Sequence, residues 1–306
     1  MRIIDTFEKR GPITKPIVIT IGNFDGVHRG HQEVIARLTK KAHDIGGESV
    51  VISFVNHPSQ VLRPDKPTLP LYSPEHKAHL LEKLGVDTLV FLSFTKEFAQ
   101  QEAKVFLSKL MQTLPFSDLI LGYDSRMGIG RKGDPATIQE LSKILAFDVE
   151  YIGPFSYNGG TVSSSTIREL VRNGKFEKSK ELLGRQYSIY AKVTSGNRRG
   201  SQLGYPTANI DVSGLTLPPY GVYAVYLEYK GKQRPGIANL GTAPTLRTQT
   251  NPILEVHLFE PIEELYGKAV EVFFEEYIRP EKKFADVVAL QKQIAQDIET
   301  VKKYLF

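Results

Sequence analysis

The chain contains no cysteine among its 306 residues. This absence excludes disulfide bonds, thiolate nucleophiles, cysteine-ligated zinc and iron–sulfur clusters, so any catalysis has to use oxygen and nitrogen groups. Excess charge of one sign is also scarce, because 39 Lys and Arg residues are balanced by 34 Asp and Glu residues. The small positive balance is too weak for a dedicated nucleic-acid binder and suits anionic phosphate ligands, so we expect no nucleic-acid partner.

Long apolar runs and a secretory leader are missing as well. No stretch approaches the roughly 20 apolar residues that a membrane helix needs, and residues 1–8 lack a basic segment followed by an apolar core. We therefore expect a cytoplasmic protein with no membrane partner. The pattern G-x-x-x-x-G-K-[ST] does not occur either, so phosphoryl transfer by this chain would need a different phosphate cradle.

The length and the 41% content of hydrophobic residues are sufficient for two hydrophobic cores. The first half alternates short β-branched runs with amphipathic stretches, a pattern typical of parallel strands joined by helices. Its predicted strands are residues 17–21, 49–54, 88–92, 119–122 and 148–152, and its predicted helices are residues 30–44, 74–84 and 135–145. Ser73 and Pro74 form a predicted N-cap and N1 pair. This half is therefore expected to be an open α/β sheet.

A helical stretch at residues 165–183, interrupted at Asn173-Gly174 and ended by Gly184, closes the first half. We place the domain boundary there, giving domains 1–184 and 185–306. The second half contains strand-like runs at residues 187–194, 221–229, 253–259 and 269–278, separated by Gly and Pro turns, which predict a small antiparallel barrel or sandwich. Residues 284–305 carry apolar side chains at helical spacing, so we expect a C-terminal helix packed on the barrel through Val287, Ile294, Ile298, Val301 and Leu305.

The motif GNFDGVHRGH, residues 22–31, directly follows the first predicted strand and opens a helix. Loops in this position bind anions through backbone N–H groups and the helix N-terminus. His28 and His31 can both reach one phosphate and donate hydrogen bonds to its developing charge, and Gly30 between them lets a nucleotide approach the backbone. Alternatively, the two histidines are ordinary surface residues at a helix start. Metal binding is disfavoured because no nearby carboxylate or third histidine completes a ligand set.

The segment SSSTIR, residues 163–168, lies at a second predicted helix start. Its hydroxyls, helix amides and arginine together would clamp a phosphate, although Ser and Thr at such a position are often simple caps. Together with the first motif, the segment makes residues 17–184 resemble the FMN adenylyltransferase module of prokaryotic FAD synthetases, a Rossmann-like nucleotidyltransferase fold. The motifs NHP at residues 56–58 and GYD at residues 122–124 agree.

The resemblance implies roles for particular residues of the first half. His28 and His31 would stabilise the transferring phosphate. The ATP and phosphate contacts would be Gly22, Asn23, Phe24, Gly30, Ser164, Thr166 and Arg168. The flavin side of the pocket would contain Asp25, His57 and Asp124. The chain departs from the family pattern at Ser125 and Met127, where aromatic residues are usual, and at Val55-Asn56, where an acidic residue and proline are common.

The second half carries two candidate motifs, PTAN at residues 206–209 and LEVHLF at residues 254–259. Thr207 and Asn209 offer oxygen ligands for a hard cation such as Mg²⁺, and the preceding glycine-rich turn with Arg198 and Arg199 offers a phosphate cradle. Strand alternation places Glu255 and His257 on one face, where Glu255 could accept a proton from a substrate hydroxyl. Taken alone, an ordinary turn and a solvated strand face explain these residues as well.

Residues 185–306 resemble riboflavin kinases throughout, in the motifs GNRRGSQLGYPTAN, GIANLGT, LEVHLF and IRPEKKF. The resemblance implies that Gly200, Thr207 and Asn209 bind Mg²⁺ and ATP, with the metal at Thr207 and Asn209. It further implies that Glu255 is the base on the ribityl 5′-hydroxyl and that Asn239 and Arg279 line the flavin pocket. Ala243 departs from the family, which often has arginine there.

The two resemblances together predict a bifunctional enzyme. It would phosphorylate riboflavin to FMN and then adenylylate FMN to FAD, using Mg²⁺ and ATP and leaving oligomeric state open. One alternative is a kinase whose first half is weak or has changed its acceptor, as the departures at Ser125 and Met127 allow. A non-catalytic flavin-binding or RNA-binding regulator is the alternative from another class, and the modest charge disfavours its RNA version.

Overall fold

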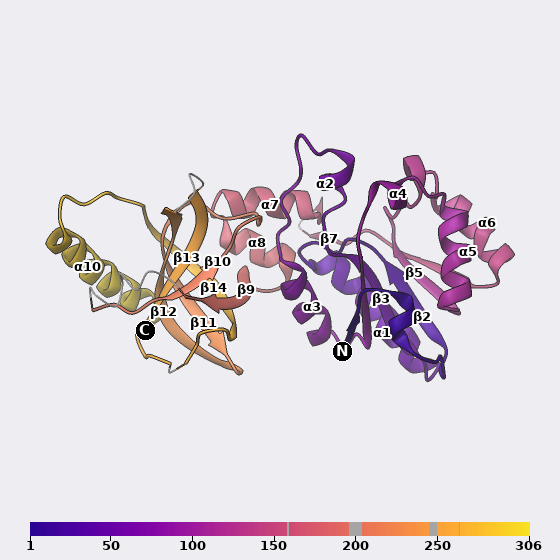
Figure 1. Ribbon diagram of the computed structural model, residues 1–306, viewed down its shortest axis with the longest axis horizontal. Helices are drawn as coiled ribbons and strands as arrows, with labels where there is room; N and C mark the ends of the chain where they lie inside the picture. Colours follow the sequence, from indigo (N-terminus) through magenta and orange to yellow (C-terminus); the bar gives the residue numbers. More distant parts are fainter. Residues whose placement is uncertain (158, 196–203, 245–249, 263) are drawn as a thin grey trace. The chain divides into compact units, whose positions relative to one another are not determined.

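A computed structural model describes residues 1–157, 159–195, 204–244, 250–262 and 264–306 (Figure 1). Internal contacts divide the chain into two units. The α/β unit comprises Met1–Pro70 and Lys77–Ser164, and the barrel unit comprises Leu71–His76 and Ser165–Phe306. The division of the two activities between residues 1–184 and 185–306 stays a prediction.

The α/β unit is built on a six-stranded parallel sheet with the order β1-β4-β3-β2-β5-β6. The strands are β1 Arg2–Ile4, β2 Ile17–Ile21, β3 Glu48–Phe54, β4 Thr88–Leu92, β5 Asp118–Gly122 and β6 Asp148–Ile152. All five predicted strands are present to within one residue at each end. β1 was not predicted, because its three residues are too short a run to show a pattern. The four central strands are apolar on both faces, as a parallel sheet covered on both sides requires.

Four helices of eight or more residues occur in the described part of the α/β sequence, and one of them begins with three residues, 74–76, that group with the barrel unit. They are α1 Arg29–Asp44, α3 Pro74–Lys83, α5 Ala103–Thr113 and α6 Pro135–Leu145, with shorter elements at η1 Phe7–Arg10, α2 Ser59–Leu62, α4 Lys96–Ala99, η2 Ile129–Arg131, β7 Ser156–Tyr157 and β8 Gly160–Thr161. The Ser73 cap is confirmed, since its hydroxyl accepts a hydrogen bond from the backbone N–H of His76 at 3.1 Å. α5 was not predicted, and no side-chain cap marks its start at Glu102.

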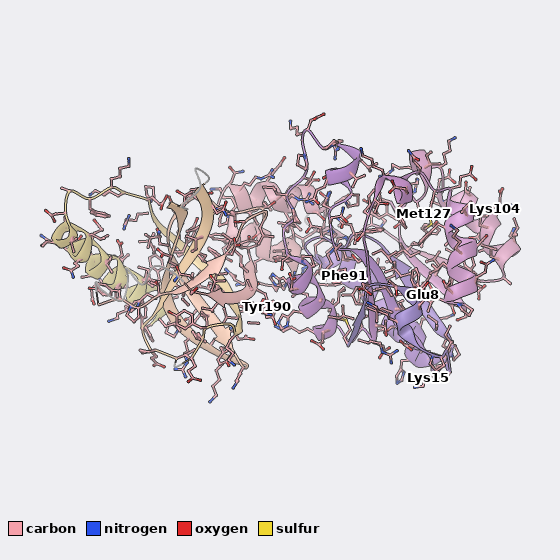
Figure 2. The ribbon with its side chains drawn as sticks, in the orientation of Figure 1. Glu8, Lys15, Phe91, Lys104, Met127 and Tyr190 are labelled. Atoms are coloured by element: carbon pink, nitrogen blue, oxygen red, sulfur yellow. The ribbon has the colours of Figure 1, made fainter. Side chains whose placement is uncertain are left out.

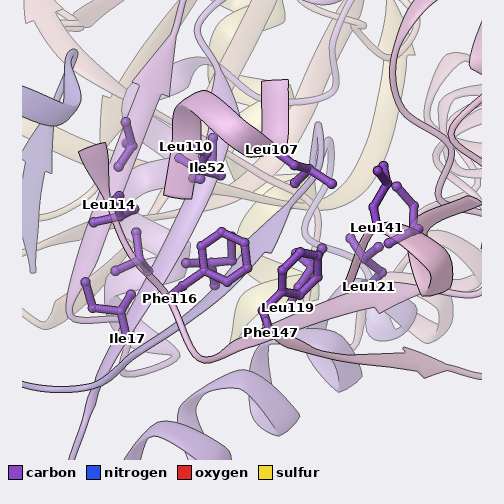
Figure 3. Close-up of a cluster of buried hydrophobic side chains, with 14 of the residues drawn as sticks. Ile17, Ile52, Leu107, Leu110, Leu114, Phe116, Leu119, Leu121, Leu141 and Phe147 are labelled. Atoms are coloured by element: carbon purple, nitrogen blue, oxygen red, sulfur yellow. The ribbon is translucent and has the colours of Figure 1, made fainter. Parts of the chain in front are cut away.

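The main core of the α/β unit lies between one face of the sheet and helices α5 and α6 (Figure 3). Leu107 and Leu110 of α5, and Leu114 directly after it, pack in one cluster with strand residues such as Ile52 and Leu119. α1 packs on β2, β3 and β5 through residues that are absent from this cluster, so it covers the opposite face. The loops that follow the strands are thus held by helices on both sides.

The barrel unit contains a closed six-stranded barrel with the order β10-β13-β12-β11-β14-β9, so the barrel form of the prediction is confirmed. The strands are β9 Ser188–Thr194, β10 Ala208–Asp211, β11 Gly221–Tyr229, β12 Lys232–Pro244, β13 Thr250–Leu258 and β14 Ala269–Pro280. β10 and β12 were not predicted. β12 contains Pro235, Gly236 and Gly241, residues that weaken the sequence pattern of a strand.

Three helices complete the barrel sequence as described: α7 Ser164–Arg172, α8 Phe176–Leu183 and α10 Val287–Leu305. Gly184 ends α8 in the left-handed conformation, as predicted. Ile298 and Val301 of α10 pack on Val222 of β11, which confirms the expected packing of this helix. The prediction was wrong for the start of the helix and for Val287. Asp286 caps the helix at residue 287, and Val287 in the first turn is 57% exposed.

Candidate active sites

The loop between β2 and α1, residues 22–28, lies where the sheet reverses its strand order. β2 pairs with β3 on one side and with β5 on the other. The chain runs from β2 through β3 to β4 toward one edge of the sheet and then crosses over to β5 and β6 toward the opposite edge. Ligands of open α/β sheets bind at such a switch point, beyond the carboxyl ends of the strands. The fold therefore places the predicted phosphate loop at the position best suited to a ligand.

The loop has an unusual backbone conformation. Phe24 and Val27 have φ values of 48° and 39°, and Gly26 between them has φ 82°. Positive φ is unfavourable for bulky and β-branched residues, costing about 1–3 kcal/mol each, and persists only where the surroundings hold it. Both apolar side chains are buried. An added Cβ on Gly22 would lie 3.0 Å from the Phe24 ring, so Gly22 makes room for that ring.

His28 and His31 are brought together at the start of α1. Their rings stack with centroids 3.6 Å apart, and the Phe24 ring meets His31 edge-on at 5.2 Å. His28 caps the helix, because its Nδ1 accepts a hydrogen bond from the backbone N–H of His31 at 3.4 Å. In the neutral ring this acceptor role puts the proton on Nε2, which makes Nε2 a donor. An added Cβ at Gly30 would touch the His28 ring at 3.4 Å, so this glycine lies close beside the pair.

The first turn of α7 is tied to the same loop. The Ser164 hydroxyl donates a hydrogen bond to the Asp25 carbonyl oxygen at 2.8 Å, which places a predicted phosphate residue directly on the loop backbone. Asp25 itself is only 2% exposed. Thr166 and Arg168 also lie on α7, but from Ser165 onward this helix groups with the barrel unit. Ser164 and Asp25 are thus brought together, and the contribution of Thr166 and Arg168 stays a prediction.

The predicted flavin-side residues of the first half lie at the ends of β3 and β5. His57 shapes the turn after β3, since its Nδ1 accepts from the backbone N–H of Ser59 at 3.1 Å. Asn56, a departure from the family pattern, exchanges two hydrogen bonds with the backbone of Phe94 at 2.8 and 2.9 Å and so joins the chain segments after β3 and β4. Asp124 is exposed in the loop after β5.

Ser125 and Met127, which depart from the family pattern, both form backbone hydrogen bonds in the loop after β5. The backbone N–H of Ser125 closes a turn on the Gly122 carbonyl at 3.0 Å. Met127 pairs with Gly133 through two backbone hydrogen bonds, and its side chain packs on the main core near α5 (Figure 2). Met127 therefore contributes to the fold of this loop. The role of Asp124 and its neighbours in flavin binding stays a prediction.

Lys77 of α3 was missed by sequence reasoning. It is 5% exposed, and its Nζ donates to the Ser53 hydroxyl and to the Phe54 carbonyl, each at 3.1 Å. A signal was present, because Lys77 precedes the buried Leu80 and Leu81 by three and four residues and so lies on the buried face of the helix. A lysine on such a face is rare unless it has partners.

Strand register assembles the predicted kinase residues of the barrel. Glu255 on β13 is paired with Asn209 on β10 and with Asn239 on β12. Directly paired residues of antiparallel strands share one face, so these three side chains form a row across three strands. Val222 on β11 continues the row beside Asn239, and Arg279 on β14 follows beside Val222. Leu254, Val256 and Leu258 are buried on the other face of β13, which confirms the predicted alternation.

The PTAN segment is held by side chains of β13 and β9. His257 Nδ1 lies 2.9 Å from the Pro206 carbonyl oxygen, and the His257 ring meets Tyr205 edge-on at 5.5 Å. Asn209 is 5% exposed, and its carbonyl accepts from the Thr194 hydroxyl at 3.2 Å. Its side-chain Nδ2 donates to the Thr207 carbonyl at 3.4 Å. Asn209 is thus hydrogen-bonded to Thr207 and paired with Glu255 on the adjacent strand.

Arg279 is occupied by an ion pair with α10. Its guanidinium donates three hydrogen bonds of 2.7–3.0 Å to the Asp297 carboxylate and stacks on Phe284 with 5.8 Å to the ring centroid. The side chains of Arg279 and Asp297 are 20% and 5% exposed. Arg279 therefore anchors the C-terminal helix to β14, and its contact with flavin stays a prediction.

The glycine-rich turn singled out in the sequence cannot be placed in this way. Gly200 lies outside the described residues, and so do Arg198 and Arg199. Ala243 lies in β12. Among the residues that the structure describes, no group of three or more His, Asp or Glu side chains is arranged to hold a metal ion. The same residues include no helix long and apolar enough to cross a membrane.

A switch-point loop with paired histidines and a six-stranded barrel with a carboxylate in a polar row define a two-domain nucleotide-using transferase. Residues 11–166 match the FAD synthetase family, and residues 183–305 match the riboflavin kinase family. The chain belongs to the family of bifunctional riboflavin kinase/FMN adenylyltransferases.

Individual relatives support this assignment along the whole chain. The bifunctional riboflavin kinase/FMN adenylyltransferase of Haemophilus influenzae is 36% identical over 306 residues, covering 99% of both chains. The protein of the same description from Bacillus subtilis is 34% identical, covering 94% of this chain and 92% of the relative. Among solved structures, a macrolide-efflux protein from Streptococcus pneumoniae is similar with a TM-score of 0.82, at 27% identity and 99% coverage of both chains.

Proposed function

We propose that this chain makes FAD from riboflavin in two ATP-dependent steps. Riboflavin is first phosphorylated to FMN, and FMN is then adenylylated to FAD with release of pyrophosphate. The observation that carries the proposal is that two complementary family matches occur in one chain that aligns with bifunctional relatives over nearly its full length. The same alignment favours two activities over the alternative of a kinase with a weak or altered first half.

The adenylylation step is assigned to residues 1–184, in which the FAD synthetase match lies. A phosphate oxygen of FMN attacks the α-phosphorus of ATP, and the bond to pyrophosphate breaks. The stacked His28 and His31 donate hydrogen bonds to the charge that develops on the phosphates. The backbone N–H groups of the loop and of the start of α1 also stabilise this negative charge. The residues close to ATP are Gly22, Asn23, Phe24 and Gly30. The residues toward the flavin are Asp25, His57 and Asp124. Ser164, Thr166 and Arg168 are the remaining phosphate ligands.

The phosphorylation step is assigned to residues 185–306, which contain all but the first two residues of the riboflavin kinase match at 183–305. Glu255 accepts the proton of the ribityl 5′-hydroxyl while that oxygen attacks the γ-phosphorus of ATP and ADP leaves. Asn239, next to Glu255 in the row, and Arg279 face the flavin side. Gly200, Thr207 and Asn209 bind ATP. Riboflavin, FMN and ATP are therefore the ligands of the chain.

Magnesium is the metal that suits these residues. Mg²⁺ prefers a few protein oxygens together with phosphate and water ligands, and Thr207, Asn209 and Glu255 supply neighbouring oxygen-bearing side chains. Thr207 and Asn209 would hold the ion. When bound with ATP, Mg²⁺ neutralises negative charge on the phosphates. A coenzyme-forming enzyme that consumes ATP at both steps belongs in the cytoplasm, where we place it.

The test incubates the purified chain with ATP and Mg²⁺ and with either riboflavin or FMN, and then separates the flavins by chromatography. Formation of FAD, with FMN appearing first, is the expected result. FMN without FAD, also when FMN is supplied directly, would support the kinase with an altered first half. No conversion of riboflavin or FMN would support a non-catalytic flavin-binding protein and overturn the proposal.

A further inference from the structure

Lys77 is a buried cation that is linked through Ser53 to the switch-point loop of the α/β unit. Its Nζ binds the Ser53 hydroxyl and the Phe54 carbonyl at the carboxyl end of β3. On the β4 side, Nζ lies 5.7 Å from the ring centroid of Phe91, which Figure 2 labels. At 5% exposure the ammonium group is too deep to act as a surface ligand for a nucleotide.

The surroundings of Lys77 contain little to compensate its charge. The contacts from β3 and β4 are a hydroxyl, a carbonyl and a phenyl ring. Asp25, from the loop after β2, is the charged group whose field acts on it and favours the protonated form. Burial outweighs this field and lowers the pKa of Lys77 to about 8. Lys77 is thus charged at neutral pH and begins to lose its proton just above it.

Hydrogen bonds connect Lys77 to the strained loop. Ser53, which accepts from Lys77, donates its own hydroxyl proton to the Asn23 carbonyl oxygen at 3.1 Å. Asn23 immediately precedes Phe24, the first residue with positive φ, and the strained stretch ends at Val27, next to His28. Left-handed conformations at such residues persist only where the surrounding structure over-determines them. The two hydrogen bonds that connect Lys77 through Ser53 to Asn23 are among the interactions that hold this conformation.

We propose that Lys77 is a positioning residue for adenylylation, which acts through Ser53 on the Asn23 carbonyl and through its charge on Asp25 to hold the loop that presents His28. The proposal rests on the proposed adenylyltransferase function of this loop. It assigns Lys77 no contact with ATP or FMN. The barrel, which carries the kinase row, contains none of these groups.

Stability distinguishes this role from a purely structural one. A buried lysine whose pKa is lowered binds its proton less tightly in the folded state than in the unfolded state, so the free energy of unfolding rises as pH increases from about 8 toward the ordinary lysine value. At neutral pH the charge therefore opposes folding. Replacing Lys77 by the apolar, similarly long Met removes that cost. A residue with only a structural role would lower stability and activity together when removed.

The experiment compares Lys77→Met with Lys83→Met, the same substitution at an exposed position of the same helix. Each full-length variant is assayed for FAD formation from FMN and for FMN formation from riboflavin, and its thermal midpoint is measured. For Lys77→Met we expect kcat of FAD formation to fall by roughly 10- to 100-fold, as displaced catalytic groups do. FMN formation and the thermal midpoint should stay at or above the values of the parent. Lys83→Met should match the parent in both assays.

A second pair of variants tests the connection through Ser53 with Lys77 intact. Ser53→Ala removes the hydroxyl that joins Lys77 to Asn23, and Ser49→Ala removes a buried hydroxyl of the same strand, bonded at 2.7 Å to Asp87 at the opposite end. We expect Ser53→Ala to slow FAD formation about 5- to 10-fold, toward the lower end of the range for misplaced groups. Ser49→Ala should leave that rate within about two-fold, even if both lose stability.

The pH profile supplies a readout that packing alone would not move. FAD formation by the parent should decline above pH 8 relative to FMN formation by the same chain, because Lys77 loses its charge. Lys77→Arg, whose guanidinium keeps its charge, should lack this decline, and so should Lys77→Met.

The outcomes distinguish the proposed adenylyltransferase function from the proposed role of Lys77. A parent chain that forms no FAD overturns the proposed adenylyltransferase function. A parent that forms FAD while Lys77→Met matches it overturns the Lys77 proposal alone. So does a Lys77→Met variant that loses FAD formation, FMN formation and thermal stability in parallel, because that pattern is the one expected of a structural residue.

Discussion

The two candidate sites are built in different ways. In the α/β unit the functional groups lie on a loop whose conformation includes positive φ at Phe24 and Val27. This conformation depends on hydrogen bonds that the Ser53 and Ser164 side chains donate to the loop backbone. In the barrel the corresponding groups project from paired strands, where register alone places Asn209 and Asn239 beside Glu255. A loop site needs supporting residues outside the motif, whereas a strand site receives its geometry from the backbone hydrogen bonds of the barrel.

The largest effect that this comparison predicts is at Glu255. Glu255→Ala should reduce FMN formation by about 10³-fold, in the middle of the range for loss of a general base, while FAD formation from supplied FMN stays within about two-fold. Flavin chromatography measures both rates. Glu276→Ala, an exposed glutamate on β14, is the matched control and should change neither rate. An unchanged kinase rate in Glu255→Ala would remove Glu255 from its role.

His28 provides the reciprocal test on the loop site. His28→Ala removes a hydrogen-bond donor to the transferring phosphate, so FAD formation should fall by roughly 10²-fold while FMN formation is kept. His43→Ala, at an exposed position near the end of the same helix, serves as the control. If FAD still forms at the parental rate, the histidine assignment is wrong. If FMN formation falls as well, the two sites are not independent.

The ion pair between Arg279 and Asp297 tests how far the strand site depends on support from α10. Asp297→Asn leaves the guanidinium without its carboxylate, and we expect the free energy of unfolding of the barrel to drop by about 2 kcal/mol, less than for a fully buried pair. The KM for riboflavin should rise and FAD formation from FMN should not change. Glu299→Gln on the exposed side of α10 is the control. Urea unfolding with an unchanged midpoint would show that register suffices without the helix anchor.

The smallest predicted effect is at the start of α10. Asp286 caps this helix by accepting from the Ala289 N–H at 2.8 Å, and Asp286→Ala should lower the free energy of unfolding by about 1 kcal/mol, the usual worth of an N-cap. Asp286→Asn should keep most of the stability, because asparagine caps equally well. Both variants should retain both activities. A lower kinase rate in Asp286→Ala alone would show that the helix start contributes to the strand site.

The sequence by itself determined those features that depend on local patterns. Apolar β-branched runs located the five longer strands of the parallel sheet, and alternation placed Glu255 and His257 on one face of β13. The motif at residues 22–31 located the switch-point loop, since a strand followed by glycines and a helix start is a local signal. The short β1 and the Pro- and Gly-containing β12 were missed, because three residues show no period and those residue types oppose a strand assignment.

Tertiary structure alone decided which distant residues act together. The pairing of Glu255 with Asn209 and Asn239 depends on strand register, which joins positions on three different strands that share no local pattern. The burial of Lys77 and its link through Ser53 to Asn23 arise only when α3, β3 and the loop after β2 pack together. Likewise, the sequence motif around Arg279 suggested a flavin contact, and folding brought Asp297 of α10 to its guanidinium. Burial and register are properties of the packed chain, so no single segment encodes them.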